Sequence, residues 1–209
     1  MAVQTIESSL DKSLERHILK ASLYLDPIPT ELRGLAVDAV LEHDPVGFLC
    51  RADNTRSLEL VYHNSDVLLE HGIYEVALIH ALSISRTNNA HFPLLLLKEL
   101  IAIGDRAKLL AAGDPLPHGG PFTLFRGVAG TGKLRRVRGI HWTSDRGRAE
   151  WFANRFAGHL VDPAVYMAVV PARDIVAHIN DRGEDEYIAL IPRSLNLVCL
   201  EQAAEVALI

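Results

Sequence analysis

Three short groups of residues with chemically useful side chains occur in a fixed order in the C-terminal half of the sequence. The first is Arg126 followed by Gly127, at the end of the apolar run 122–125. An arginine presents a planar fork of N–H donors, which suits a diphosphate better than the point charge of a lysine. This pair therefore indicates a phosphate-binding position at the end of a strand.

The other two groups are a pair of hydroxyls and a pair of carboxylates. Thr143 and Ser144 end a second apolar run, 139–142. Glu184 and Glu186 flank one residue and lead into the apolar run 187–191. A fixed carboxylate can stabilise positive charge that develops on a sugar, and a nearby hydroxyl can hold that carboxylate in place. These residue types could therefore serve a reaction in which positive charge develops on a sugar.

Each group also has an ordinary structural interpretation when it is taken alone. Arg126 at a strand end is commonly solvated or salt-bridged. Ser144 or Asp145 before a helix is commonly an N-cap, and the acidic stretch 184–186 is commonly a solvated turn. The order and spacing of all three groups are what favour a functional site.

In that order, the three groups resemble the ADP-ribosyltransferase superfamily, in its arginine–serine–glutamate branch of cholera-toxin-like and binary-toxin-like enzymes. The resemblance covers about residues 122–192. It implies that Arg126, with Gly127, binds a phosphate of NAD, and that Glu186 is the catalytic glutamate. It further implies that Glu184 orients or deprotonates the acceptor, for which an arginine side chain is the first expectation.

The same resemblance places the segment 141–144 beside the nicotinamide. Trp142 stands where the family has the first serine of its Ser-Thr-Ser element, so we expect this aromatic ring to line the nicotinamide slot. Thr143 and His141 are expected to contact NAD from the same strand, although His141 is equally compatible with a plain strand residue. Ser144 is expected to hold Glu186.

The function expected from this resemblance is that of an enzyme, an NAD-dependent mono-ADP-ribosyltransferase, which is a glycosyltransferase with NAD as substrate. The acceptor is a macromolecule, protein before nucleic acid, in a setting such as a bacterial toxin or effector. Whether an inhibitor or antitoxin binds the protein is left open. Two alternatives stay open: an NAD glycohydrolase that uses the same site, and an inactive module that binds NAD or a partner.

Other motifs in the sequence are weaker. The segment 127–133 matches the glycine and lysine spacing of a P-loop, but Leu134 occupies the position of the magnesium-binding hydroxyl. Arg135, Arg136 and Arg138 follow Lys133 in a basic cluster. This cluster is either a solvated loop or a contact for NAD phosphates or a nucleic-acid acceptor.

Composition limits the class of protein. The formal charge of −5 over 209 residues gives no overall attraction to nucleic acid or an anionic membrane. Cys50 and Cys199 lie in apolar runs and are expected to be buried, which argues against a disulfide scaffold. No paired metal-ligand spacing occurs, so no metal site is expected.

The first 17 residues lack a secretory pattern and no run is long enough to span a membrane, so a cytoplasmic protein is expected. Export by a dedicated machine is left open.

Hydrophobic periodicity predicts an α+β fold, with a helical N-terminal part over 1–118 and a mainly antiparallel sheet, the ADP-ribosyltransferase-like core, over 119–209. The helical part is expected to have one helix that Pro27 ends, a second beginning at Thr30, a third over 73–84 and a fourth over 93–112. Residues 46–63 fit either two short strands or, as we prefer, a loop leading into a helix. Strands are expected over 122–125, 140–143, 165–170, 175–179, 187–191 and 195–200, with a helix over 145–156.

Overall fold

The computed structural model describes residues 2–84, 92–132, 135–155, 159–180, 183 and 185–200, with side chains from residue 12 onward. The chain forms two compact units. One contains residues 1–91 and 99–105, and the other contains residues 92–98 and 106–209.

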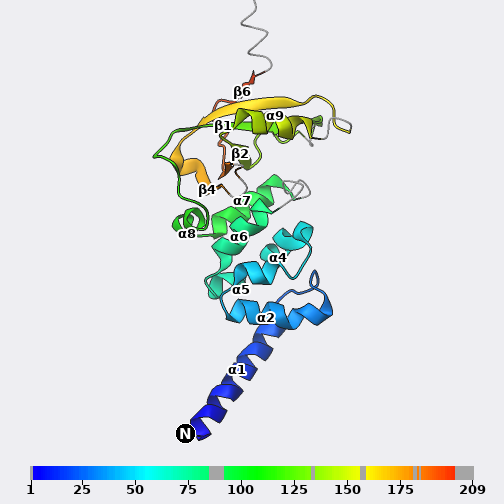
Figure 1. The fold of residues 1–209 in the computed structure, drawn as a ribbon, viewed down its shortest axis with the longest axis vertical. Helices are drawn as coiled ribbons and strands as arrows, with labels where there is room; N and C mark the ends of the chain where they lie inside the picture. Colours follow the sequence, from blue (N-terminus) through cyan, green and yellow to red (C-terminus); the bar gives the residue numbers. More distant parts are fainter. Residues whose placement is uncertain are drawn as a thin grey trace, which may run out of the picture. The chain divides into compact units, whose positions relative to one another are not determined.

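The first unit is helical (Figure 1), as the sequence predicts. Residues 46–63 contain helices and not the two strands that were the alternative, because aspartates cap both turns: Asp44 accepts from the Gly47 amide and Asp53 from the Thr55 amide. The elements of this unit are α1 (Ala2–Ser22), η1 (Thr30–Leu32), α2 (Arg33–Leu41), α3 (Pro45–Leu49), η2 (Asn54–Arg56), α4 (Ser57–His63), α5 (Ser65–Glu70) and α6 (Tyr74–Ser83).

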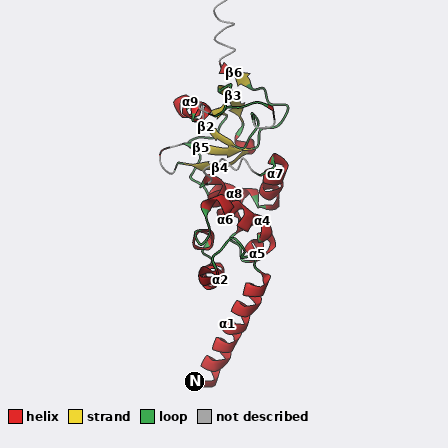
Figure 2. Ribbon diagram, turned by 90° about the vertical axis from the view of Figure 1, so that its right-hand side faces the viewer, coloured by secondary structure: helices red, strands yellow, loops and turns green. Residues whose placement is uncertain are grey.

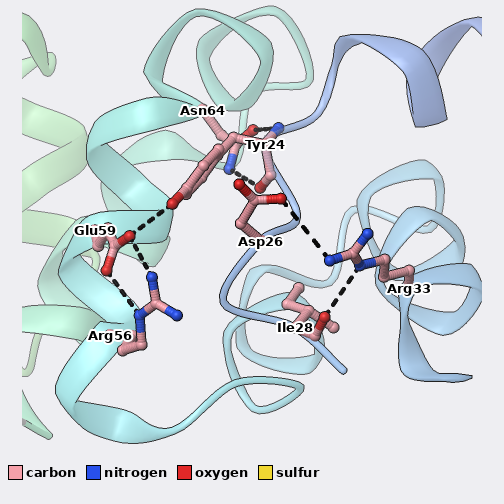
Figure 3. A network of polar contacts seen from close by, with 7 residues as sticks. All are labelled: Tyr24, Asp26, Ile28, Arg33, Arg56, Glu59 and Asn64. Carbon is pink, nitrogen blue, oxygen red and sulfur yellow. Dashed lines mark hydrogen bonds and ion pairs between the residues drawn. The ribbon is translucent and has the colours of Figure 1, made fainter. Parts of the chain in front are cut away.

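A polar network fixes the chain segment that follows α1 (Figure 3). The side chain of Asn64, which is 1% exposed, accepts from the amide of Tyr24 at 2.7 Å and donates to the carbonyls of Tyr24 and Leu60. The Tyr24 hydroxyl donates to Glu59, which also receives two hydrogen bonds from Arg56. The buried side-chain amide of Asn64 has partners for both its oxygen and its nitrogen. It therefore ties the segment after α1 to α4.

The prediction of a single helix over 93–112 is wrong. The structure has two helices there, α7 (Leu94–Ile103) and α8 (Arg106–Ala111). The amide of Asp105 donates to the buried Glu75 carboxylate at 2.9 Å, so it does not continue the helical ladder. The guanidinium of Arg106, which begins α8, donates to the carbonyls of Ala172 and Ile175. Accordingly α8 belongs to the second unit, and the division between the units does not follow a single cut near residue 119.

The second unit contains an antiparallel sheet with strand order β4-β5-β2-β1-β3-β6 (Figure 2), so the expected α+β fold with an antiparallel sheet is confirmed. The longest strands, β1 and β3, pair with each other along seven residues, and the edge strand β6 pairs through only two. The strands are β1 (Phe122–Val128), β2 (His141–Thr143), β3 (Ala164–Val170), β4 (Ile175–Ile179), β5 (Glu186–Ala189) and β6 (Val198–Cys199).

Two apolar clusters pack against this sheet. The larger contains Trp142, Tyr187 and Phe122, with Leu124, Ala168, Val170, Ile175, Ala189 and Ile191. The smaller is made by Ala149 and Ala153 of α9 (Arg146–Asn154), Val165 of β3 and the half-buried Phe125. Because neighbouring residues of a strand point to opposite faces, Leu124 and Phe125 serve different clusters. Helix α9 therefore covers the Phe125 face of β1 and β3 (Figure 1).

Gly127 is where α9 comes closest to the sheet. A Cβ atom at this position would lie 1.9 Å from the carbonyl oxygen of Ala149 and 2.6 Å from the amide nitrogen of Ala153. Both are backbone atoms, so no side chain can move aside to make room. The glycine that the sequence suggested for NAD binding thus has a packing role between β1 and α9.

Both cysteines lie closer to the surface than the sequence predicts. Cys50 is exposed and Cys199 is only partly buried, so the expectation that both are buried is wrong. Cys50 follows the last turn of the short helix α3, where its side chain is free of the core. In the described part of the chain, no helix is long and apolar enough to cross a membrane.

We predict that Gly127→Ala lowers the free energy of unfolding by about 1–3 kcal/mol, because the new methyl group overlaps the α9 backbone. Urea unfolding followed by circular dichroism measures the change. Gly119→Ala is the matched control, since a Cβ there meets nothing within 4 Å. Equal stability of the two variants would contradict the close approach of α9 to β1.

We also predict a loss of stability between pH 10 and pH 12 that depends on Tyr187. Burial, with a contribution from the charge of Asp185, raises the pKa of Tyr187 to about 12. The folded chain keeps this proton over a range in which the unfolded chain, with a tyrosine pKa of about 10, has lost it. The stabilisation is complete below pH 10 and disappears as the pH rises through 12. Tyr187→Phe should flatten the fall in urea midpoint over that range, and an unchanged slope would refute the assignment.

Candidate active site

Arg126, on β1, lies in a small cage of backbone carbonyls. Its Nε donates to the carbonyl of Arg136 at 3.0 Å and its Nη1 donates to the carbonyl of His141. The cage exists because Gly139 has no side chain: a Cβ there would lie 2.3 Å from Nη2 of Arg126. These hydrogen bonds of Arg126 therefore tie β1 to the loop 129–140 and to the start of β2.

Arg126 is a poorly compensated cation. Burial lowers the pKa of Arg126 to about 10, the charge of Arg136 acts in the same direction, and the carboxylate of Glu186 opposes them. The group is still protonated at neutral pH. Among the described residues, no carboxylate lies within 4 Å of this guanidinium. A desolvated cation with carbonyl partners alone favours an anionic ligand.

Strand β2 divides its side chains between two faces. Trp142 is 2% exposed, packs in the larger apolar cluster and donates its indole N–H to the carbonyl of Gly139 at 2.8 Å. The expectation that Trp142 lines an open nicotinamide slot is therefore wrong for this structure, because the strand alternation points the ring into the core. His141 and Thr143 lie on the opposite face of β2, where both are buried.

Glu186 begins β5 directly opposite Thr143. Side chains of paired residues in antiparallel strands share a face, so Glu186 lies on the face of His141 and Thr143. Nδ1 of His141 lies 2.6 Å from Oε1 of Glu186, and the two side chains are 7% and 20% exposed. Glu186 is thus held by a histidine, a role that the sequence analysis did not assign to His141, and its carboxylate keeps limited access to solvent.

Ser144 has a different partner from the one expected. Its hydroxyl donates to Oδ2 of Asp185, the residue between the two glutamates, and not to Glu186. Oδ1 of the same carboxylate lies 2.7 Å from Nε2 of His178 on β4. Sequence reasoning missed both Asp185 and His178, because neither belongs to the hydroxyl or glutamate pattern. Glu184 lies outside the described residues.

The N-cap of α9 is Asp145, whose carboxylate accepts from the Arg148 amide at 3.1 Å. The hydroxyl of Thr143 accepts from the Asp145 amide at 3.1 Å. The sequence offered Ser144 or Asp145 as the N-cap of this helix. In the structure the N-cap is Asp145. Ser144 is exposed, with its hydroxyl directed to the start of β5.

The arginines of the basic cluster 133–138 are bound to backbone carbonyls of other segments. Arg135 donates to the carbonyl of Asp162 at 2.6 Å and lies over the ring of Tyr166. Arg136 donates to the carbonyl of Phe92 at 2.7 Å. Arg138 donates to two carbonyls of the segment after β5, at 2.6 and 2.9 Å. These guanidiniums hold loops together, and Lys133 lies outside the described residues.

The structure thus brings together the cation of Arg126 and the carboxylate of Glu186, which are close enough to interact electrostatically. It adds His141 to them and separates Trp142 from them. No group of three or more metal-binding side chains occurs in the part of the chain that the structure describes. The arrangement can bind an anionic group and stabilise positive charge beside it.

We predict that inorganic pyrophosphate or ADP raises the unfolding temperature of the protein, and that Arg126→Gln removes this effect. A ligand at 100 times its Kd stabilises by about 2.7 kcal/mol, so tenfold weaker binding is readily seen by differential scanning fluorimetry. Arg173→Gln is the control, because Arg173 is exposed on η4 (Ala172–Asp174) of the same unit. A full shift in Arg126→Gln would exclude Arg126 as the anion site.

Comparison with known proteins gives no relative: no protein-family model, no curated protein and no solved structure matches this chain.

Proposed function

We propose that this protein is an NAD-dependent mono-ADP-ribosyltransferase that transfers ADP-ribose to a macromolecular acceptor. The observation that carries the proposal is the pairing of His141 with a half-buried Glu186 beside the desolvated cation of Arg126. The resemblance of the three motifs to the arginine–serine–glutamate enzymes supports the same conclusion. A bacterial toxin or effector acting in the cytoplasm is the setting that this function suggests.

The proposed reaction breaks the bond between the nicotinamide nitrogen and the ribose C1′ of NAD. The bonding electrons go to nicotinamide, and positive charge develops on the ribose. A carboxylate fixed near the sugar stabilises this charge, which is the role of Glu186. An acceptor nucleophile then forms the new bond to C1′ and loses one proton.

Arg126 has the complementary role toward the diphosphate of NAD. Its guanidinium is desolvated and carries a full charge, which its carbonyl partners and the carboxylate of Glu186 compensate only in part. Holding the diphosphate on one side fixes the ribose relative to Glu186, and such positioning lowers the barrier to reaction.

His141 sets the orientation of the catalytic carboxylate in this scheme. Its Nδ1 lies 2.6 Å from Oε1 of Glu186, so one oxygen is engaged by the ring. The second oxygen is then the one available to the ribose hydroxyls. This is the positioning task that the resemblance assigns to Ser144, performed here by a histidine on the same strand.

An arginine side chain is the proposed acceptor, from the resemblance of Glu184 to the acceptor-orienting glutamate of the family. A protein acceptor is favoured over nucleic acid, because the formal charge of −5 gives the chain no overall attraction to nucleic acid. The acceptor class is decided by the experiment below.

The first test is the rate of nicotinamide release from NAD by purified protein. We expect Glu186→Gln to lower it about 10²–10³-fold, since the amide removes the negative charge but keeps the size. Glu150→Gln on α9 is the control, because Glu150 is half exposed in a surface pair with Arg146. Cleavage by Glu186→Gln at the wild-type rate would overturn the proposal.

The second test uses biotinylated NAD and a cell lysate treated with either protease or nuclease. Label that protease removes, and that Glu186→Gln does not produce, supports a protein-directed transferase. Label that nuclease removes instead contradicts the protein acceptor. Nicotinamide release without label identifies an NAD glycohydrolase, and no binding of NAD at millimolar concentration leaves an inactive partner-binding module.

A further inference from the structure

His178 is a buried histidine with an oxygen atom at each ring nitrogen. It is 5% exposed, on β4, where it pairs with Tyr187 of β5. Its Nδ1 lies 2.9 Å from the carbonyl oxygen of Pro115, and its Nε2 lies 2.7 Å from Oδ1 of Asp185. Its ring also lies on that of Tyr187, with centroids 4.6 Å apart.

These partners determine how many protons the ring carries. A carbonyl oxygen can only accept, so Nδ1 of His178 must bear a hydrogen. The Asp185 carboxylate accepts as well, and it already receives the Ser144 hydroxyl on its other oxygen. Toward an ionised Asp185 carboxylate, Nε2 must then also donate. An imidazole with two N–H groups is a cation, so this geometry favours an ion pair between the buried His178 ring and the partly exposed Asp185 carboxylate.

Asp185 needs such support, because its backbone is in the left-handed region with φ at +45°. A residue other than glycine is strained in this conformation and keeps it only where its surroundings hold it. Asp185 directly precedes Glu186, so its backbone angles set the direction in which β5 and the Glu186 side chain begin.

We propose that His178 is a positively charged positioning residue, which acts through Asp185 to place the Glu186 carboxylate. Ser144 holds the same aspartate from the end of β2, so two strands support it from opposite sides. The effect on catalysis rests on the proposed function, whereas the protonation of the ring does not.

Further charged groups lie on the elements around His178. Asp114 is beside it in the described part of the chain: its amide donates to the His178 carbonyl at 2.7 Å, and its Oδ2 accepts from the Asn180 amide at 2.6 Å. The cations of α8, which packs against β4, are Arg106 and Lys108, and Arg106 is bound to the carbonyls of Ala172 and Ile175. Tyr187 on β5 is uncharged below pH 10, since its pKa is raised to about 12.

The charge of the ring is measured by ¹⁵N NMR of histidine-labelled protein at pH 7. We expect both ring nitrogens of His178, assigned by comparison with His178→Gln, to be of the protonated type. Asp185→Asn should convert one of them to the unprotonated type. A wild-type ring with a single N–H would mean that Asp185 carries the proton, and this would overturn the ion pair whether or not the protein cleaves NAD.

The positioning role is measured by NAD cleavage in a double-mutant cycle. His178→Gln should lower kcat about 10- to 100-fold with little change in KM, since a displaced catalytic group costs rate while Arg126 is untouched. Asp185→Gly relieves the left-handed strain, so in its background His178→Gln should have a much smaller effect. His159→Gln, at an exposed histidine, is the control.

Additive effects in this cycle would show that His178 only packs against Tyr187, and an unchanged kcat in folded His178→Gln would equally overturn the positioning role. If His178→Gln fails to fold, Asp185→Gly alone is compared with Asp185→Asn. The glycine variant should then retain the higher kcat, and the reverse order would contradict the inference. Wild-type protein that does not cleave NAD refutes the proposed function and leaves the NMR test intact.

Discussion

The cage around Arg126 is the interaction on which the geometry of the candidate site depends. A guanidinium withdrawn from water must satisfy its donors, and here the carbonyls of Arg136 and His141 accept from it. These two carbonyls belong to the connection 129–140 and to β2, so one side chain of β1 fixes a loop and a neighbouring strand. The position of His141, and through it that of Glu186, follows from this arrangement.

Two histidines divide the support of the acidic segment at the start of β5. His141 contacts Glu186 from β2, and His178 contacts Asp185 from β4. Because β5 lies between these strands in the sheet, the two rings approach the acidic segment from both neighbours. Adjacent carboxylates repel each other, and this repulsion is offset when each carboxylate has its own partner. The two histidines supply one partner to each carboxylate.

Much of the fold could be predicted from the sequence, because hydrophobic periodicity reports which face of an element is buried. The apolar runs 165–170 and 175–179 correspond closely to β3 and β4. The end of α7 was missed, since the amide of Asp105 is drawn away by Glu75, thirty residues earlier in the chain. A contact of that separation leaves no local pattern.

The site was predicted in part. Arg126 and Glu186 were identified by type and order, and the structure brings their charges together. The burial of Trp142 could also have been predicted, because strict alternation in β2 puts it on the face opposite His141 and Thr143. The hydrogen bond from Ser144 to Asp185, in place of the expected one to Glu186, could not be predicted, since no sequence pattern indicated the left-handed backbone of Asp185.

The absence of Cβ atoms at Gly127 and Gly139 has a consequence for tracing the ancestry of this chain. One glycine admits the backbone of α9 and the other admits the guanidinium of Arg126, so drift at either position is restricted by geometry and not by the reaction. Distant homologues that have lost all overall similarity should still keep an Arg-Gly pair on one strand and a glycine shortly before the next. Such a spaced signature, together with a histidine two residues after that glycine, would recognise them even where Glu186 has been replaced.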